Sequence, residues 1–81
     1  MKTSLPSLDR LMVDEATQLI DKGSELTTYR LTTEAYFGML TQFVLLEERM
    51  SEAGLLSQNA AEQIRLMVHP VYERHLDARR E

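Results

Sequence analysis

The fold is decided by the run Ala35-Tyr-Phe-Gly-Met-Leu-Thr-Gln-Phe-Val-Leu-Leu46, in which nine of twelve residues are hydrophobic. The run is too short to cross a membrane, because a spanning helix needs about 20 apolar residues, and Glu47-Glu48-Arg49 follows it directly. A helix that is apolar around most of its circumference must be covered on more than one side. The run therefore predicts a helix covered partly by its own chain and partly by a second protein chain.

Length and composition limit how such a chain is stabilised. Its 81 residues are near the size at which one hydrophobic core is only marginally sufficient. The absence of cysteine excludes disulfides and thiolate metal ligands. We therefore expect one small helical domain over residues 1–81, stabilised by packing and by assembly into a homodimer. The N-terminal residues show no secretion signal, which favours a cytoplasmic location.

The charge balance is acidic, with 9 basic and 13 acidic side chains and a net charge of −4. Proteins that bind nucleic acid usually present a basic face to the phosphates. Only residues 64–81 are mildly basic here, and Arg79 and Arg80 are explained by the favourable placement of cations at the carbonyl end of a helix. We therefore expect neither a nucleic acid nor a membrane as partner.

Helical spacing and punctuation predict an all-α, three-helix bundle with helices at about 7–22, 33–53 and 58–79. Ser7 is a candidate N-cap for the first helix, and Gly23 is a natural stop. An apolar stripe follows at helical spacing. It comprises Leu5, Leu8, Leu11, Met12, Ala16 and Leu19.

The second helix is punctuated at both ends. Ser24–Leu31 contains weak helix formers and predicts a loop. Thr32 is a candidate N-cap, and Leu31 before it can pack on Tyr36 as a hydrophobic staple. Gly54 predicts the end of this helix.

The third helix should begin after Ser57, a plausible N-cap, and it contains Pro70. Proline inside a helix removes one hydrogen bond and clashes with the preceding turn. Because the apolar stripe keeps its phase across Pro70, a bent but continuous helix is favoured. A break at His69, with a short fourth helix starting at Pro70, remains the alternative.

The second helix carries two apolar stripes. The first, here called the Tyr36 stripe, alternates three and four residues apart, as in coiled coils. It comprises Tyr36, Met39, Phe43, Leu46, Met50 and Ala53. The second, here called the Phe37 stripe, lies about 80–100° round the helix and comprises Phe37, Leu40 and Val44. We assign the Phe37 stripe, together with Glu47, to the contact with a partner chain.

Glu47 lies near the middle of the combined apolar surface on a helical projection. A carboxylate buried there would need an opposite charge within reach. The arginines available for that role are Arg10, Arg30, Arg49, Arg65 and Arg74. The competing interpretation is that the helix emerges into water at Glu47-Glu48-Arg49.

Candidate chemistry is sparse. The chain has no cysteine, no GxSxG turn and no glycine-rich phosphate loop, so we expect no enzyme and no cofactor. His69 and Glu73 share a helical face, but two ligands in one segment are too few for a closed metal site. We therefore expect no metal.

Two functional classes remain. The first is a small helical interaction protein, a regulator, antiactivator, adaptor or chaperone that covers a surface of another protein. The alternative is a DNA-binding regulator of helix-turn-helix type, in which Ser57–Val68 would be the recognition helix with Arg65 as its one basic residue. The acidic balance favours the first class.

Overall fold

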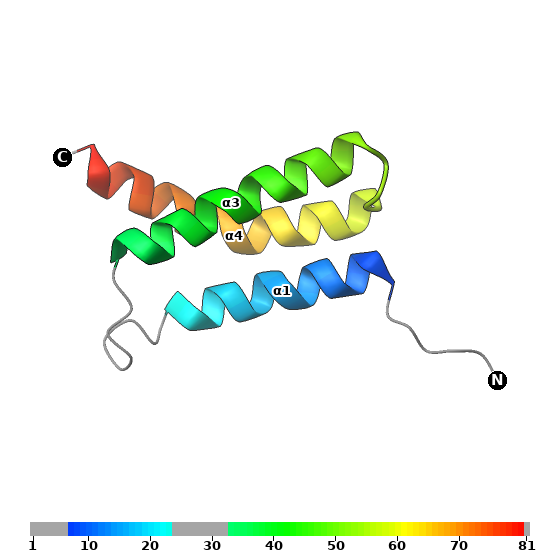
Figure 1. Cartoon of the computed structure of the whole chain (residues 1–81), viewed down its shortest axis with the longest axis horizontal. Helices are drawn as coiled ribbons and strands as arrows, with labels where there is room; N and C mark the ends of the chain where they lie inside the picture. The colour runs from blue at the N-terminus through cyan, green and yellow to red at the C-terminus, as the bar shows by residue number, and fades with distance from the viewer. Residues whose placement is uncertain (1–6, 24–32, 81) are drawn as a thin grey trace.

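The computed structural model describes residues 7–23 and 33–80, and its elements are the helices α1 (Leu8–Gly23), α3 (Thr33–Glu52) and α4 (Gln58–Arg79) (Figure 1). The all-α, three-helix prediction is confirmed, and no strand occurs in these residues. Every helix boundary lies within one residue of the predicted position. The predicted loop at Ser24–Leu31 and the Thr32 cap with its Leu31 staple lie outside the described residues.

Serine side chains cap two of the helices as the sequence predicts. The Ser7 hydroxyl accepts a hydrogen bond from the Arg10 backbone N–H at 3.2 Å at the start of α1. At the start of α4, the Ser57 hydroxyl accepts from the Ala60 N–H at 3.1 Å. Each bond satisfies a backbone donor that has no partner within its own helix.

Gly54 ends α3 and turns the chain back into α4. Its φ of 74° is in the left-handed region, which glycine enters without a Cβ penalty. The Leu55 N–H donates to the Met50 carbonyl at 2.9 Å, and the Gly54 N–H donates to the Ser51 carbonyl at 3.1 Å. This pair of bonds is the Schellman motif. The turn allows α4 to return antiparallel to α3 (Figure 1).

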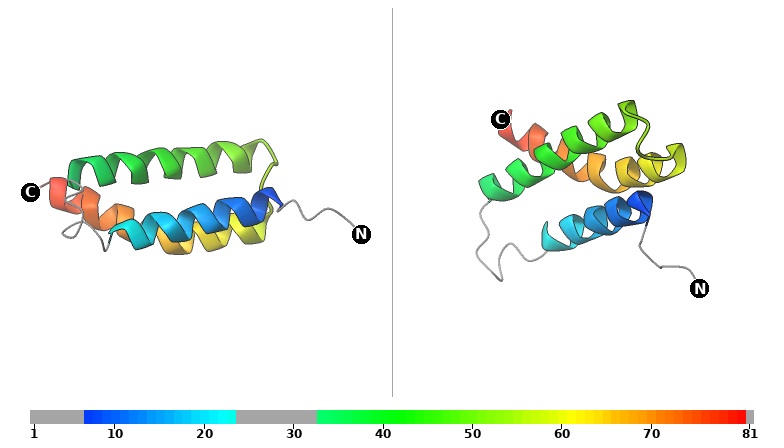
Figure 2. Two further views of the ribbon diagram at one scale, coloured as in Figure 1. Left: turned by 60° about the horizontal axis from the view of Figure 1, so that its bottom comes forward. Right: turned by 45° about the vertical axis from the view of Figure 1, so that its right-hand side comes forward.

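Helix α4 is the centre of the bundle. Both α1 and α3 pack mainly on α4 and much less on each other, and Figure 2 shows α1 and α3 as separate rods against α4. Buried side chains from all three helices and from the turn after α3 form one core. It comprises Met12, Ala16, Leu19, Tyr36, Leu40, Val44, Leu56, Ala60, Ile64 and Val68.

Tyr36 links α3 directly to α1. Its hydroxyl donates to the Leu19 carbonyl at 2.8 Å, and its ring lies against Gly23, where a Cβ would come within 2.5 Å of the hydroxyl oxygen. Burial raises the pKa of the Tyr36 phenol, and the positive charge of Arg74 opposes that rise. Residue 36 of α3 therefore lies beside residues 19–23 of α1.

Pro70 lies inside α4, which continues without interruption from Gln58 to Arg79. The alternative of a break at His69 required two helices in this segment, and the structure has one. The bend at Pro70 stays a prediction. None of the described helices is long and apolar enough to cross a membrane.

Candidate interaction surface

The residues predicted to contact a partner chain are largely covered by the chain itself. Leu40, Val44 and Glu47 are 0%, 8% and 1% exposed. Phe37 is half-buried, and its ring stacks on that of Tyr72 in α4, with centroids 5.5 Å apart. Helix α4 therefore occupies the Phe37 stripe, so in this structure the stripe is core and not surplus surface. A contact between these residues and a partner stays a prediction.

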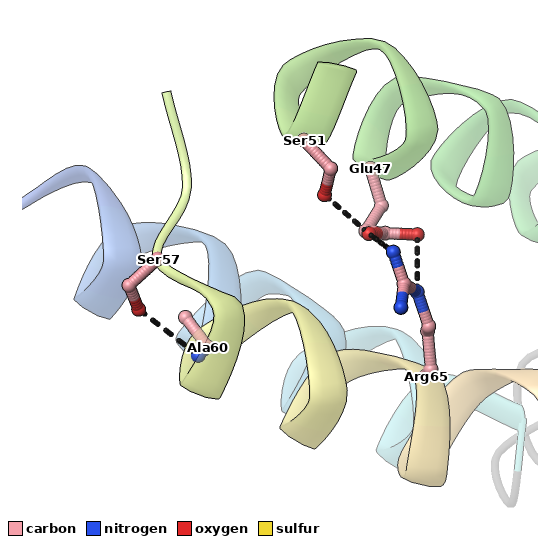
Figure 3. A network of polar contacts seen from close by, with 5 residues as sticks. All are labelled: Glu47, Ser51, Ser57, Ala60 and Arg65. Atoms are coloured by element: carbon pink, nitrogen blue, oxygen red, sulfur yellow. Dashed lines mark hydrogen bonds and ion pairs between the residues drawn. The ribbon is translucent and has the colours of Figure 1, made fainter. Parts of the chain in front are cut away.

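Glu47 is buried in an ion pair between α3 and α4 (Figure 3). Arg65 Nε donates to Oε1 of Glu47 at 3.3 Å, and Arg65 Nη2 donates to Oε2 at 3.0 Å. The Ser51 hydroxyl donates to Oε2 at 2.6 Å. Of the two interpretations of Glu47, the structure thus shows the buried one, with Arg65 as partner. A bidentate pair of this kind fixes the position of α4 along α3.

A groove lies between α1 and α3. It has a volume of about 570 Å³. Residues of both helices line it: Glu15, Gln18, Leu19, Lys22, Met39, Gln42, Phe43, Leu45, Leu46 and Arg49. Met39, Leu45 and Leu46 are 37%, 47% and 44% exposed. The unpartnered apolar surface of α3 is therefore on this side.

The Tyr36 stripe is divided between core and groove. Tyr36 is buried, whereas Met39 and Leu46 are exposed in the groove and Phe43 is half-buried there. The physical reason is the position of α4, which packs on the neighbouring Phe37 stripe. The sequence therefore identified two apolar stripes, and in the structure α4 packs on the Phe37 stripe while part of the Tyr36 stripe lines the groove.

The groove side of α1 carries a stripe that sequence reasoning missed. Leu8, Leu11, Glu15, Gln18 and Lys22 follow one another three and four residues apart, so they share one helical face. The last three line the groove, and Leu8 and Leu11 are 40% and 46% exposed. We call these five residues the α1 stripe. Its spacing is visible in the sequence, but Leu8 and Leu11 were placed there in one apolar stripe with Met12, Ala16 and Leu19.

A matching set on α3, here called the α3 stripe, consists of Met39, Gln42, Leu46 and Arg49, again three and four residues apart. The two stripes bring three charges to the groove, namely Glu15 and Lys22 from α1 and Arg49 from α3. None of these three side chains forms an ion pair within residues 7–23 and 33–80. The groove thus combines exposed apolar side chains with charges of both signs.

Aromatic side chains join the start of α3 to the end of α4. There the His75 ring meets the Tyr36 ring edge-on at 5.4 Å, and the Arg79 guanidinium lies 4.4 Å from the centroid of Phe37. These contacts give His75 and Arg79 packing roles. In the part of the chain that the structure describes, no three histidine, aspartate or glutamate side chains are grouped so that they could hold a metal ion.

None of the protein-family models, curated proteins or solved structures compared with this chain matches it.

Proposed function

We propose that this chain is a small, non-enzymatic helical interaction protein that regulates or chaperones a protein partner by covering its surface. The observation that carries the proposal is the groove between α1 and α3. Exposed apolar side chains that gather in one concave place, with polar groups around them, are typical of a protein contact surface. Met39, Leu45 and Leu46 provide such an apolar surface on a chain of only 81 residues.

The alternative of a helix-turn-helix DNA reader has weaker support. Its recognition helix would begin at Ser57, and its one basic residue, Arg65, holds the buried carboxylate of Glu47. The same segment buries Ala60 and Ile64 in the core. A titration with nonspecific duplex at low salt addresses this alternative directly, because binding that is governed by phosphate contacts is strongest there.

An affinity capture with matched variants tests the interaction function. The full chain is immobilised as wild type, as Leu46→Glu in the groove and as Leu66→Glu on α4. Leu66 is 72% exposed and does not line the groove, so it controls for the added charge. A partner from the native host should be retained by wild type and Leu66→Glu and lost with Leu46→Glu. Identical capture by all three would refute the groove as the contact surface.

We also propose that the chain assembles as a homodimer. The support is the same unpartnered surface, because small chains commonly gain stability by covering such surfaces through association.

A further inference from the structure

We propose that the groove between α1 and α3 binds an acidic amphipathic helix of a partner protein, which lies along the two helices as the fourth helix of a bundle. The inference rests on the interaction function proposed above and assigns a chemistry to the segment of the partner that makes the contact.

The arrangement of the three helices leaves a position for a further helix. Helices α1 and α3 both pack on α4 and much less on each other. All the described residues that line the groove belong to α1 or α3, so α4 and the groove lie on opposite sides of the α1–α3 pair. A helix in the groove would therefore complete an arrangement of four helices, as in a four-helix bundle.

The spacing of the lining residues suits a helical occupant. The members of the α1 stripe, and those of the α3 stripe, follow one another three and four residues apart. This alternation is the pattern with which helices pack at small crossing angles in coiled coils and four-helix bundles. On α3, Met39 and Leu46 are two turns apart and are 37% and 44% exposed. An amphipathic helix with apolar side chains at matching spacing would cover both.

Contacts with α4 show how the charged residues of the groove are ordered. The Thr17 hydroxyl lies 3.7 Å from Sδ of Met67, and Glu47 pairs with Arg65. Helix α1 runs parallel to α4 (Figure 1). Glu15, two residues before Thr17, is therefore about level with Arg65, two residues before Met67. Because Glu47 of α3 is held at Arg65, Glu15 and Glu47 lie at about the same level.

The charges are consequently divided between the two ends of the groove. Arg49 is two residues beyond Glu47 on α3, so Arg49 and Glu15 lie toward the same end on opposite walls. Lys22 is seven residues after Glu15 on α1, which places it about 10 Å away toward the other end. The lining residues thus provide one cation toward each end, from opposite walls.

This order of charges favours an acidic occupant. Two cations and one anion line the groove, although the whole chain has a net charge of −4. Carboxylates on opposite edges of the occupant's apolar stripe, about two turns apart, can pair with Lys22 and Arg49. A basic helix would instead place like charges beside both cations. Complementary charges of this kind select the partner and orient it, while the apolar stripe supplies the buried contact.

A fluorescence anisotropy titration of the full chain with two labelled synthetic peptides tests the charge of the occupant. Both peptides have about 15 residues, the length of the α1 stripe, and leucines at helical spacing. One peptide has glutamates and the other has lysines on both edges of the leucine stripe. Wild type should bind the acidic peptide about tenfold or more tightly than the basic one. Equal affinities, tighter binding of the basic peptide or no binding of the acidic peptide would overturn the proposal.

Variants of the chain test where the acidic peptide binds, and circular dichroism checks that each remains folded. Leu46→Glu should weaken binding by about tenfold or more, and the control Leu66→Glu should bind like wild type. Arg49→Glu should weaken binding by about fivefold or more at low salt. Arg10→Glu makes the same charge change at an exposed residue outside the groove lining and should alter the affinity by less than about twofold. Equal effects of Arg49→Glu and Arg10→Glu would overturn the proposed charge pairing.

Sedimentation equilibrium separates this occupant from a second copy of the chain. The homodimer proposed above would use the same surface, so the complex should contain one chain and one peptide. A complex that retains two chains would place the peptide outside the groove and overturn the proposal. If capture of a host protein is lost with Leu46→Glu and unaffected by Arg49→Glu, the interaction function stands and the acidic helix is refuted.

Discussion

Removing Arg65 should destabilise the fold more than neutralising Glu47, although the two residues belong to one ion pair. The reason is their unequal burial, since the Glu47 side chain is 1% exposed and that of Arg65 is 48% exposed. If Glu47 is changed to Gln, the guanidinium of Arg65 can turn toward water. If Arg65 is changed to Met, the carboxylate of Glu47 stays in the core with only the Ser51 hydroxyl as partner.

The expected magnitudes follow from this asymmetry. Breaking a buried pair so that one charge is left uncompensated costs about 3–5 kcal/mol. Arg65→Met should fall at the lower end, about 3 kcal/mol, because the Ser51 hydroxyl remains. Glu47→Gln weakens two charge-assisted hydrogen bonds but also relieves the desolvation of a carboxylate, so about 1 kcal/mol is expected. Glu48→Gln, at an exposed position, should change the unfolding free energy by less than about 0.5 kcal/mol.

Urea titration followed by circular dichroism measures these differences. A slope of about 1 kcal/mol per molar urea is typical of so small a domain. The midpoint should therefore fall by about 3 M for Arg65→Met and about 1 M for Glu47→Gln, while Glu48→Gln stays near wild type. Equal and small losses for all three variants would show that the ion pair does not stabilise the fold. A larger loss for Glu47→Gln than for Arg65→Met would refute the reasoning from burial.

Three further predictions concern single residues. Gly23→Ala should lower the unfolding free energy by about 1–3 kcal/mol in a urea titration, because the new Cβ would displace the ring of Tyr36. Unchanged stability would contradict this close contact. Pro70→Ala should leave helicity equal or slightly higher by circular dichroism, with stronger amide-exchange protection across residues 66–74, whereas a loss of helicity would contradict a continuous α4. The backbone N–H of Ser57 donates to Asp9 and holds the pKa of that carboxyl below its usual range. Asp9 therefore contributes stability above its unfolded pKa, and this contribution is lost as pH falls through the lower folded pKa. Asp9→Asn should remove that part of the acid sensitivity in thermal melts below about pH 4, and an unchanged acid profile would show that the bond contributes nothing.

Helix existence and helix ends were predictable because their signals are local. The Ser57 cap acts on a backbone N–H three residues away, and Gly54 acts through its own backbone angle. Ser7 marks the start of α1 in the same way as Ser57, and α1 ends at Gly23. Such signals depend on a few neighbouring residues, so the sequence contains all that is needed to read them.

The choice of buried face on α3 was not predictable by the same means. The Phe37 and Tyr36 stripes are both apolar, and neither stripe alone indicates which one α4 covers. The deciding contact is the pair formed by Glu47 and Arg65, which lie 18 residues apart in the sequence. A charged residue at the end of an apolar run is commonly exposed to solvent. Glu47 is buried instead because Arg65 on the facing helix α4 lies where it can pair with the carboxylate.

The groove itself follows from which side chains α1 directs toward α3. Glu15, Gln18 and Lys22 occupy the facing positions, and polar groups of this kind favour water over a dry contact with Phe43 or Met39. The Tyr36 ring links the two helices at one end, where its hydroxyl reaches the Leu19 carbonyl. Between these features α1 and α3 stay apart, although each packs closely on α4. The open surface is therefore a consequence of the polar residues that α1 presents to α3.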